Sequence, residues 1–173
     1  MTVSDAHIRA CQEQVIRYLE DHPEQCITTS TIRGTAADGL SCQVTQDEHS
    51  VLMDMGRAMG GMATAPSPGF FVKAGIVGCI AIATKMTAAR LGLQFRSVDV
   101  EVETDTDALA VFGTGERNAA PLDVRIRIFI DSDETDEKID ALVSRVLAID
   151  TWFLALRDPQ PVSIGWERQQ VVA

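Results

Sequence analysis

The sequence lacks the excess of positive charge that nucleic-acid-binding proteins carry. Its 173 residues include 15 Lys and Arg against 25 Asp and Glu, so the formal net charge at pH 7 is −10. Binding to a phosphate backbone needs a basic surface, and an anionic membrane would repel an acidic chain. The length suits one domain with a sizeable core. We therefore expect small-molecule ligands, and neither nucleic acid nor membrane partners.

Closely spaced metal ligands are missing too. The four cysteines are Cys11, Cys26, Cys42 and Cys79, and no two of them form a C-x-x-C pair. The three histidines do not cluster with them. Because zinc sites are built from such clusters, we expect no metal and no cofactor.

A targeting segment and a membrane span are also missing from the pattern. Residues 1–24 contain no basic region followed by an apolar stretch, which a secretory signal requires. The longest apolar run, 74–83, is shorter than the about 20 residues that cross a bilayer. We expect a cytoplasmic protein, in which reducing conditions keep the cysteines as free thiols.

Hydrophobic periodicity predicts an α+β fold with antiparallel sheets. Strands that are grouped apart from helices along the chain are typical of this class. The expected elements, in chain order, are a helix over 4–21, a meander of short strands over 26–33, 39–45 and 49–55, a loop over 56–68, a long helix over 69–91, a hairpin over 97–105 and 122–131, a helix that begins in the acidic segment 131–137, the segment 151–156 as its extension or as a second short helix, and a last strand over 161–167.

The long helix over 69–91 is apolar on most sides. Gly75 and Gly78 lie inside it, and an interior glycine costs about 1 kcal/mol relative to alanine. Close approach by another helix is the usual compensation. Because a chain of this size has little material to cover such a helix, we expect it to be buried with the help of a partner chain in a homodimer.

Two cysteines lie in phase with apolar faces. Cys11 shares the apolar stripe of the first helix, and Cys42 alternates with Leu40 and Val44. We expect both to be small core residues. Cys79 lies near the middle of the long apolar helix, and the remaining question is whether its thiol is a core group or a reactive one.

The stretch MGGMATAPSPGFFVKAGIVGCIAIATKMTAARLGL resembles the signature of the OsmC/Ohr family. It shares a Gly-Gly loop, a proline-rich entry and an apolar helix whose cysteine, Cys79, follows Pro68 by eleven positions. The similarity covers about 26–166, so residues 1–173 are expected to form a single OsmC-like domain with an extra helix at about 4–21. The resemblance implies an intertwined homodimer with its sites at the subunit interface, and reduction of organic hydroperoxides by a pair of cysteines.

The chain departs from the family pattern in two places. In the family, the first cysteine becomes a sulfenic acid, and a second cysteine closes a disulfide that a dithiol reopens. Asp150 stands about where that second cysteine would be, and Gly69 and Phe70 stand where the family often has a glutamate. No arginine matches the family's thiolate partner, and Arg33 and Arg57 are candidates by position only.

Cys79 therefore has two interpretations. A nucleophilic thiolate needs a lowered pKa, whereas apolar surroundings raise the pKa of a thiol, and an ionised Asp150 beside it would raise that pKa further. The alternative is a buried cysteine in a remodelled pocket. For Asp150, the alternative to a catalytic role is an exposed carboxylate beside Trp152, which we expect.

Three functions remain open at this stage. The first is a one-cysteine thiol peroxidase in oxidative-stress defence, in which an external thiol reduces the sulfenic acid of Cys79. Cys11, Cys26 or Cys42 would replace that thiol only if the fold brought one of them near. The second is a non-catalytic protein that binds a small apolar ligand at the dimer interface. The third is acid–base or hydrolytic chemistry by Cys79 with Asp150, although no histidine lies in a motif that would pair with the cysteine.

Overall fold

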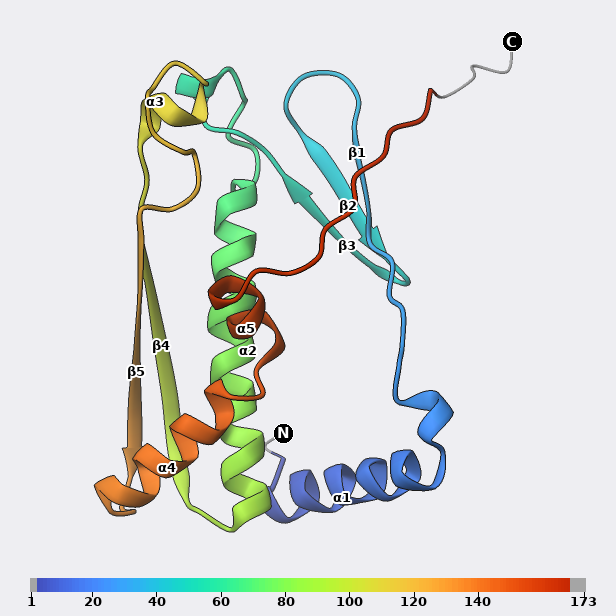
Figure 1. The fold of residues 1–173 in the computed structure, drawn as a ribbon, viewed down its shortest axis with the longest axis vertical. Coiled ribbons are helices and arrows are strands. Elements are labelled where there is room, and N and C mark those ends of the chain that lie inside the picture. Colours follow the sequence, from blue (N-terminus) through green and yellow to red (C-terminus); the bar gives the residue numbers. More distant parts are fainter. Residues whose placement is uncertain (1–2, 169–173) are drawn as a thin grey trace.

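The computed structural model describes residues 3–168 and has two antiparallel sheets with a long helix between them (Figure 1). One sheet has the order β1–β2–β3, and the other is the hairpin β4–β5. The expected α+β class is confirmed. The elements are α1 (Asp5–Asp21), η1 (Pro23–Gln25), β1 (Arg33–Ala36), β2 (Cys42–Gln46), β3 (His49–Met53), η2 (Arg57–Met59), α2 (Pro68–Leu91), β4 (Phe95–Asp105), α3 (Ala108–Val111), β5 (Asp123–Ser132), α4 (Asp136–Leu147) and α5 (Thr151–Arg157).

The central element is α2, and two residues define its ends. Pro68 occupies the first turn, where a missing backbone N–H is tolerated. Gly92 ends the helix in the left-handed conformation, with φ 75°, and its N–H binds the carbonyl oxygens of Ala88 and Ala89. The hairpin, α4 and α5 pack against α2, and α1 crosses near its C-terminal end (Figure 1).

The core lies where the C-terminal half of α2 meets β4 and α4. Four residues, Ala88, Phe95, Leu142 and Val146, are almost completely buried and form one cluster. Full burial of a large apolar side chain contributes about 1.5–3 kcal/mol, so this cluster anchors α4 and the hairpin to α2. The partly buried residues packed around it are Ala83, Leu93, Val98, Ile130 and Ile139.

The opposite side of α2 is uncovered in the single chain. Val72, Ile82 and Met86 are 64%, 62% and 40% exposed. The helix is therefore buried on one side only. By length and composition it would also suit a membrane span, with a mean hydropathy of 1.5 over its most apolar 18 residues, a criterion that core helices meet as well. The expectation that every apolar segment is too short to span a bilayer does not hold for α2.

The hairpin has one apolar and one charged face, as the alternation of its residues predicts. Val98, Val100 and Val102 pair with Ile130, Ile128 and Ile126 on the inner face. On the outer face, three arginines form seven ion pairs with six carboxylates: Arg96 with Asp131 and Asp133, Arg125 with Glu103, Asp105 and Asp123, and Arg127 with Glu101 and Glu103.

Two predicted strands are wrong. Residues 26–32 are irregular, and the first strand of the meander begins only at Arg33. The segment 161–167 is irregular as well, and Ile164 is 93% exposed. Both segments have strand-like composition, but a strand also needs a neighbour to accept its backbone hydrogen bonds, and none of the described strands lies beside them.

The N-terminal helix is confirmed as α1, and its start follows the predicted cap. Ser4 accepts a hydrogen bond from the backbone N–H of His7 over 3.3 Å. Cys11, however, is exposed and not a core residue. The apolar stripe of α1 is mostly uncovered in the single chain, and Val15 is 57% exposed.

Candidate functional site

Cys79 lies in the middle of α2 and is partly buried. The residue after it, Ile80, is completely buried against the interior. Helical geometry places Cys79 at the border between the covered and the uncovered side of α2. Its sulfur lies near the start of α5, where the side chain of Asp150 and the backbone N–H of Trp152 both influence the pKa of the thiol.

Asp150 is the residue that starts α5. Its Oδ1 accepts a hydrogen bond of 2.8 Å from the backbone N–H of Phe153, the geometry of an N-cap. The side chain is only 3% exposed, which corrects the expectation of an exposed carboxylate. Its second oxygen, Oδ2, is buried without a hydrogen-bond partner among residues 3–168. The expected neighbour, Trp152, is itself 62% exposed.

The structure thus brings together two of the predicted site residues, Cys79 and Asp150. Burial is the largest influence that raises the pKa of the Cys79 thiol above its ordinary value, and the nearby side chain of Asp150 raises it further. The backbone N–H of Trp152 lowers the same pKa by a smaller amount. At neutral pH the Cys79 thiol is therefore protonated.

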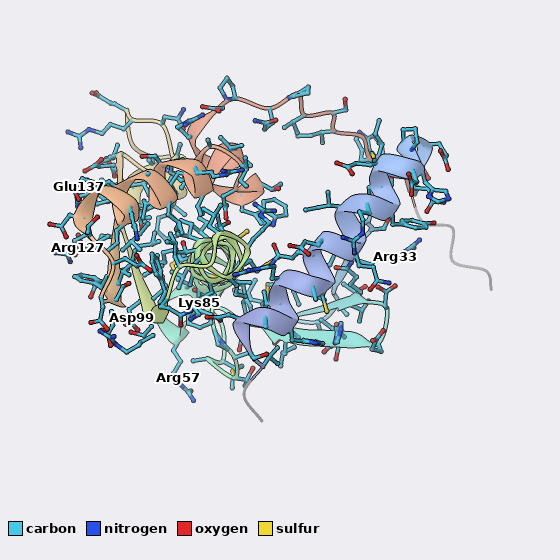
Figure 2. The ribbon with its side chains drawn as sticks, turned by 90° about the horizontal axis from the view of Figure 1, so that it is seen from below. Arg33, Arg57, Lys85, Asp99, Arg127 and Glu137 are labelled. Atoms are coloured by element: carbon cyan, nitrogen blue, oxygen red, sulfur yellow. The ribbon has the colours of Figure 1, made fainter. Side chains whose placement is uncertain are left out.

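The two arginine candidates lie elsewhere in the single chain. Arg33 is at the start of β1 and Arg57 begins η2, and both are exposed. Figure 2 shows their side chains at the periphery, well away from the axis of α2. Neither contributes to the environment of Cys79, which is set by burial, Asp150 and Trp152.

Sequence analysis missed Asp54, which organises the loop that leads into α2. This carboxylate is 2% exposed and accepts hydrogen bonds from the backbone N–H groups of Met55, Met62 and Thr64 and from the Thr64 hydroxyl. These bonds hold the pKa of Asp54 below its ordinary value, the backbone N–H of Thr64 contributing most. A lone acidic residue in the apolar run VLMDM was the available signal.

An apolar groove of about 380 Å³ runs between β5 and the helices α4 and α5. Phe153, whose N–H binds Asp150, is one of its walls. The groove therefore lies on the same helix that carries the acidic neighbour of Cys79. It is lined by Val124, Ile126, Ile128, Leu147, Phe153, Leu156 and Arg157.

A metal centre has no counterpart in the part of the chain that the structure describes. Within residues 3–168, no three His, Cys, Asp or Glu side chains come close enough to share an ion. The chemistry available at the site is that of one thiol, one carboxylate and the backbone N–H of Trp152.

Comparison with known proteins places this arrangement in a family. The family model described as OsmC-like protein matches residues 60–164, more than half of the chain and the part that contains both Cys79 and Asp150. The chain belongs to the OsmC-like protein family. Members of this family are generally dimeric. No curated protein sequence gives a significant match.

Solved structures of OsmC-like proteins share the fold. An OsmC-like protein from Mycoplasma pneumoniae has a TM-score of 0.64 at 12% identity, over 75% of this chain and 88% of that one. An organic hydroperoxide resistance protein OsmC from Legionella pneumophila has a TM-score of 0.55 at 17% identity, with coverage of 77% and 92%. A putative organic hydroperoxide resistance protein from Vibrio cholerae, with captopril bound in one of its active sites, has a TM-score of 0.54 at 18% identity, with coverage of 77% and 88%. These likenesses establish the fold.

Proposed function

We propose that this OsmC-like protein is a homodimeric, thiol-dependent hydroperoxide reductase that uses one cysteine, Cys79, in cytoplasmic oxidative-stress defence. The observation that carries the proposal is the placement of the Cys79 sulfur, partly buried on α2 against the buried carboxylate of Asp150. Related structures that are named organic hydroperoxide resistance proteins support the substrate class.

The reaction needs a small-molecule reductant. Oxidation of Cys79 by a hydroperoxide gives a sulfenic acid, which condenses with a thiol to a mixed disulfide, and a second thiol then releases Cys79. The other cysteines lie on α1, after η1 and on β2, and none of them contributes to the surroundings of Cys79. We therefore assign the reducing step to an external thiol.

The uncovered side of α2 supports the proposed homodimer. Val72, Ile82 and Met86 form an exposed apolar surface there, which we call the α2 face. Contiguous exposed apolar surface of this kind marks an interaction site. Because members of the family are generally dimeric, we assign a second copy of the chain as the partner.

The decisive experiment measures peroxide consumption by the purified dimer. Cumene hydroperoxide and hydrogen peroxide are supplied with a monothiol or a dithiol as reductant, and wild type is compared with Cys79→Ser. Dimedone labelling after brief exposure tests for the sulfenic acid at Cys79. We expect turnover with both reductants and none in Cys79→Ser. A folded wild type that gives neither turnover nor a dimedone adduct overturns the proposal.

A second candidate function is the binding of a small apolar ligand without chemistry. The raised pKa of Cys79, caused first by burial and then by Asp150, favours it, and so does the apolar groove beside α5. A ligand that binds only the native state raises the melting temperature. A panel of apolar compounds tested by thermal shift checks this function, and the absence of any shift rejects it.

A further inference from the structure

The second oxygen of Asp150 has no structural task. Oδ1 completes the cap of α5 by accepting from Phe153, whereas Oδ2 is buried and unpartnered among the described residues. Serine, threonine or asparagine would cap the helix as well without placing a negative charge inside the protein. Capping therefore explains why residue 150 is polar but leaves its charge unexplained.

No cation of the described chain supplies the missing partner. A buried carboxylate is normally paired or hydrogen-bonded at both oxygens. Asp150 is the titratable side chain that acts on the Cys79 thiol, and no donor among residues 3–168 reaches Oδ2 of Asp150. Several cations of α2 and of the elements packed against it bind other acceptors. Arg9 of α1 donates to the Ala89 carbonyl, Lys85 of α2 to the Phe95 carbonyl, Arg96 of β4 to Asp131 and Asp133, Lys138 of α4 to Glu134, and Arg157 of α5 to Asp158.

The group that remains beside Asp150 is the Cys79 thiol, which carries a transferable proton. We propose that Asp150 is a catalytic residue that accepts the proton of Cys79 as the sulfur attacks a hydroperoxide, and then delivers it to the departing alkoxide. This inference rests on the proposed function, because it assigns a role within that reaction.

The step balances without a further reactant. The sulfur of Cys79 attacks the terminal oxygen of R–O–O–H, so that an S–O bond forms while the O–O bond breaks. The electron pair of the O–O bond leaves with the alkoxide, which takes the thiol proton through Asp150 and departs as R–OH. Sulfur loses two electrons and the peroxide gains them, giving the sulfenic acid of Cys79. Asp150 ends the step in the same protonation state in which it began.

Two mechanisms make opposite predictions for Asp150→Asn. The amide oxygen still caps α5, but the negative charge and the base are gone. Removing a nearby negative charge makes the thiolate more abundant at a given pH. If the thiolate simply attacked unaided, Asp150→Asn would be oxidised faster than wild type. If Asp150 moves the proton, the variant is oxidised more slowly, because general base catalysis typically contributes about 100-fold or more.

The experiment uses the full chain with Cys11, Cys26 and Cys42 replaced by serine, so that Cys79 is the only thiol. Sulfenic acid formation with cumene hydroperoxide is followed by dimedone trapping and mass spectrometry between pH 5.5 and 8. The background protein is compared with Asp150→Asn and with Asp150→Ser, which keeps the cap but has no carboxylate. Asp150→Glu tests whether a carboxylate at this position restores the rate, and melting temperatures confirm that each variant is folded.

We expect the background protein to react at a rate that changes little with pH, because its reactive form is the protonated thiol beside the carboxylate. The two variants without a carboxylate, Asp150→Asn and Asp150→Ser, should be oxidised about 100-fold more slowly at pH 6. Their rate should rise about tenfold per pH unit as the thiolate forms. Equal or faster oxidation of Asp150→Asn overturns the role of Asp150 while the proposed function stands. Absence of oxidation in the background protein overturns the proposed function, and the inference with it.

Discussion

Thr64 binds Asp54 twice, donating to Oδ2 from its backbone N–H over 2.9 Å and from its hydroxyl over 2.8 Å. The two residues lie at opposite ends of the glycine-rich loop that joins β3 to α2. Their contact closes the loop and fixes where α2 begins. Since α2 carries Cys79, the position of the thiol depends on a carboxylate that takes no part in its chemistry.

Replacing Asp54 by asparagine should lower the melting temperature and remove part of its dependence on acid. The folded-state pKa of Asp54 is lowered, so its contribution to stability is complete above the ordinary aspartate pKa of about 4 and is lost as pH falls through the lowered value. In Asp54→Asn, an NH2 group replaces one carboxylate oxygen. This NH2 cannot accept a hydrogen bond, so at least one of the four donors that bind Asp54 loses its acceptor. Thermal unfolding between pH 3 and 7 measures the effect, and identical pH profiles for both proteins would refute it.

Gly61→Ala should disrupt the same loop by steric means. A Cβ at residue 61 would clash with the carbonyl oxygen of Met55 and would lie 2.9 Å from Oδ1 of Asp54. Backbone cannot move aside as a flexible side chain can, so we expect a loss of about 1–3 kcal/mol of unfolding free energy. Gly56→Ala is the matched control, because its new Cβ would meet nothing within 4 Å. Equal stability of the two variants in urea denaturation would contradict the contact.

Arg9→Ala should detach α1 from α2. The guanidinium of Arg9 donates from Nε to the carbonyl oxygen of Ala89 over 2.9 Å, at the C-terminal end of α2, where a positive charge is favourable. Loss of this bond should cost about 1.5 kcal/mol of local stability. Hydrogen exchange over residues 5–21 reports it directly. Arg17→Ala, on an exposed position of the same helix, should leave the exchange unchanged.

A charge on the α2 face should separate the proposed dimer. Ile82 is 62% exposed in the single chain, and Ile82→Glu would bury a carboxylate in the interface. Sedimentation velocity should show a dimer for wild type and a monomer for the variant. Phe129→Glu, on the charged face of the hairpin, should remain dimeric. A wild-type protein that sediments as a monomer would refute this use of the α2 face.

Cys79 should be the slowest thiol to be alkylated at neutral pH. Burial and then Asp150 raise its pKa, whereas Cys11 and Cys26 are exposed. Because the thiolate is the form that reacts with iodoacetamide, the rate at Cys79 should climb steeply above pH 8.5. Peptide mass spectrometry after timed labelling separates the sites. Labelling of Cys79 ahead of Cys11 at pH 7 would show that a cation reaches the thiol in solution.

Local chemical signals predicted the elements that position the site. Pro68 and Gly92 determine the ends of α2 through backbone geometry alone, and the alternation of valine and isoleucine predicted the pairing of β4 with β5. Such signals are contained in a few consecutive residues. The structure that they predict therefore does not depend on residues far away in the sequence.

Burial and strand pairing were harder to predict, because they depend on distant neighbours. Residues 26–32 have strand-like composition but no adjacent strand, and Cys11 lies on an apolar stripe that the single chain leaves uncovered. Asp150 was expected at the surface, although an aspartate one residue before an apolar helical segment is a capping signal. That it is buried against Cys79 is set by the packing of α5 on α2, which no short stretch of sequence encodes.

The charged outer face of the hairpin limits the directions in which this molecule can associate. Its three arginines and their carboxylates are about half exposed, so each pair adds little stability in water. Covering that face with another protein would strip hydration from every one of these charges, a penalty that their mutual attraction rarely repays. The same ion pairs that contribute little to folding therefore act as a barrier to docking, and they leave the opposite, apolar side of the protein as the favourable direction of approach.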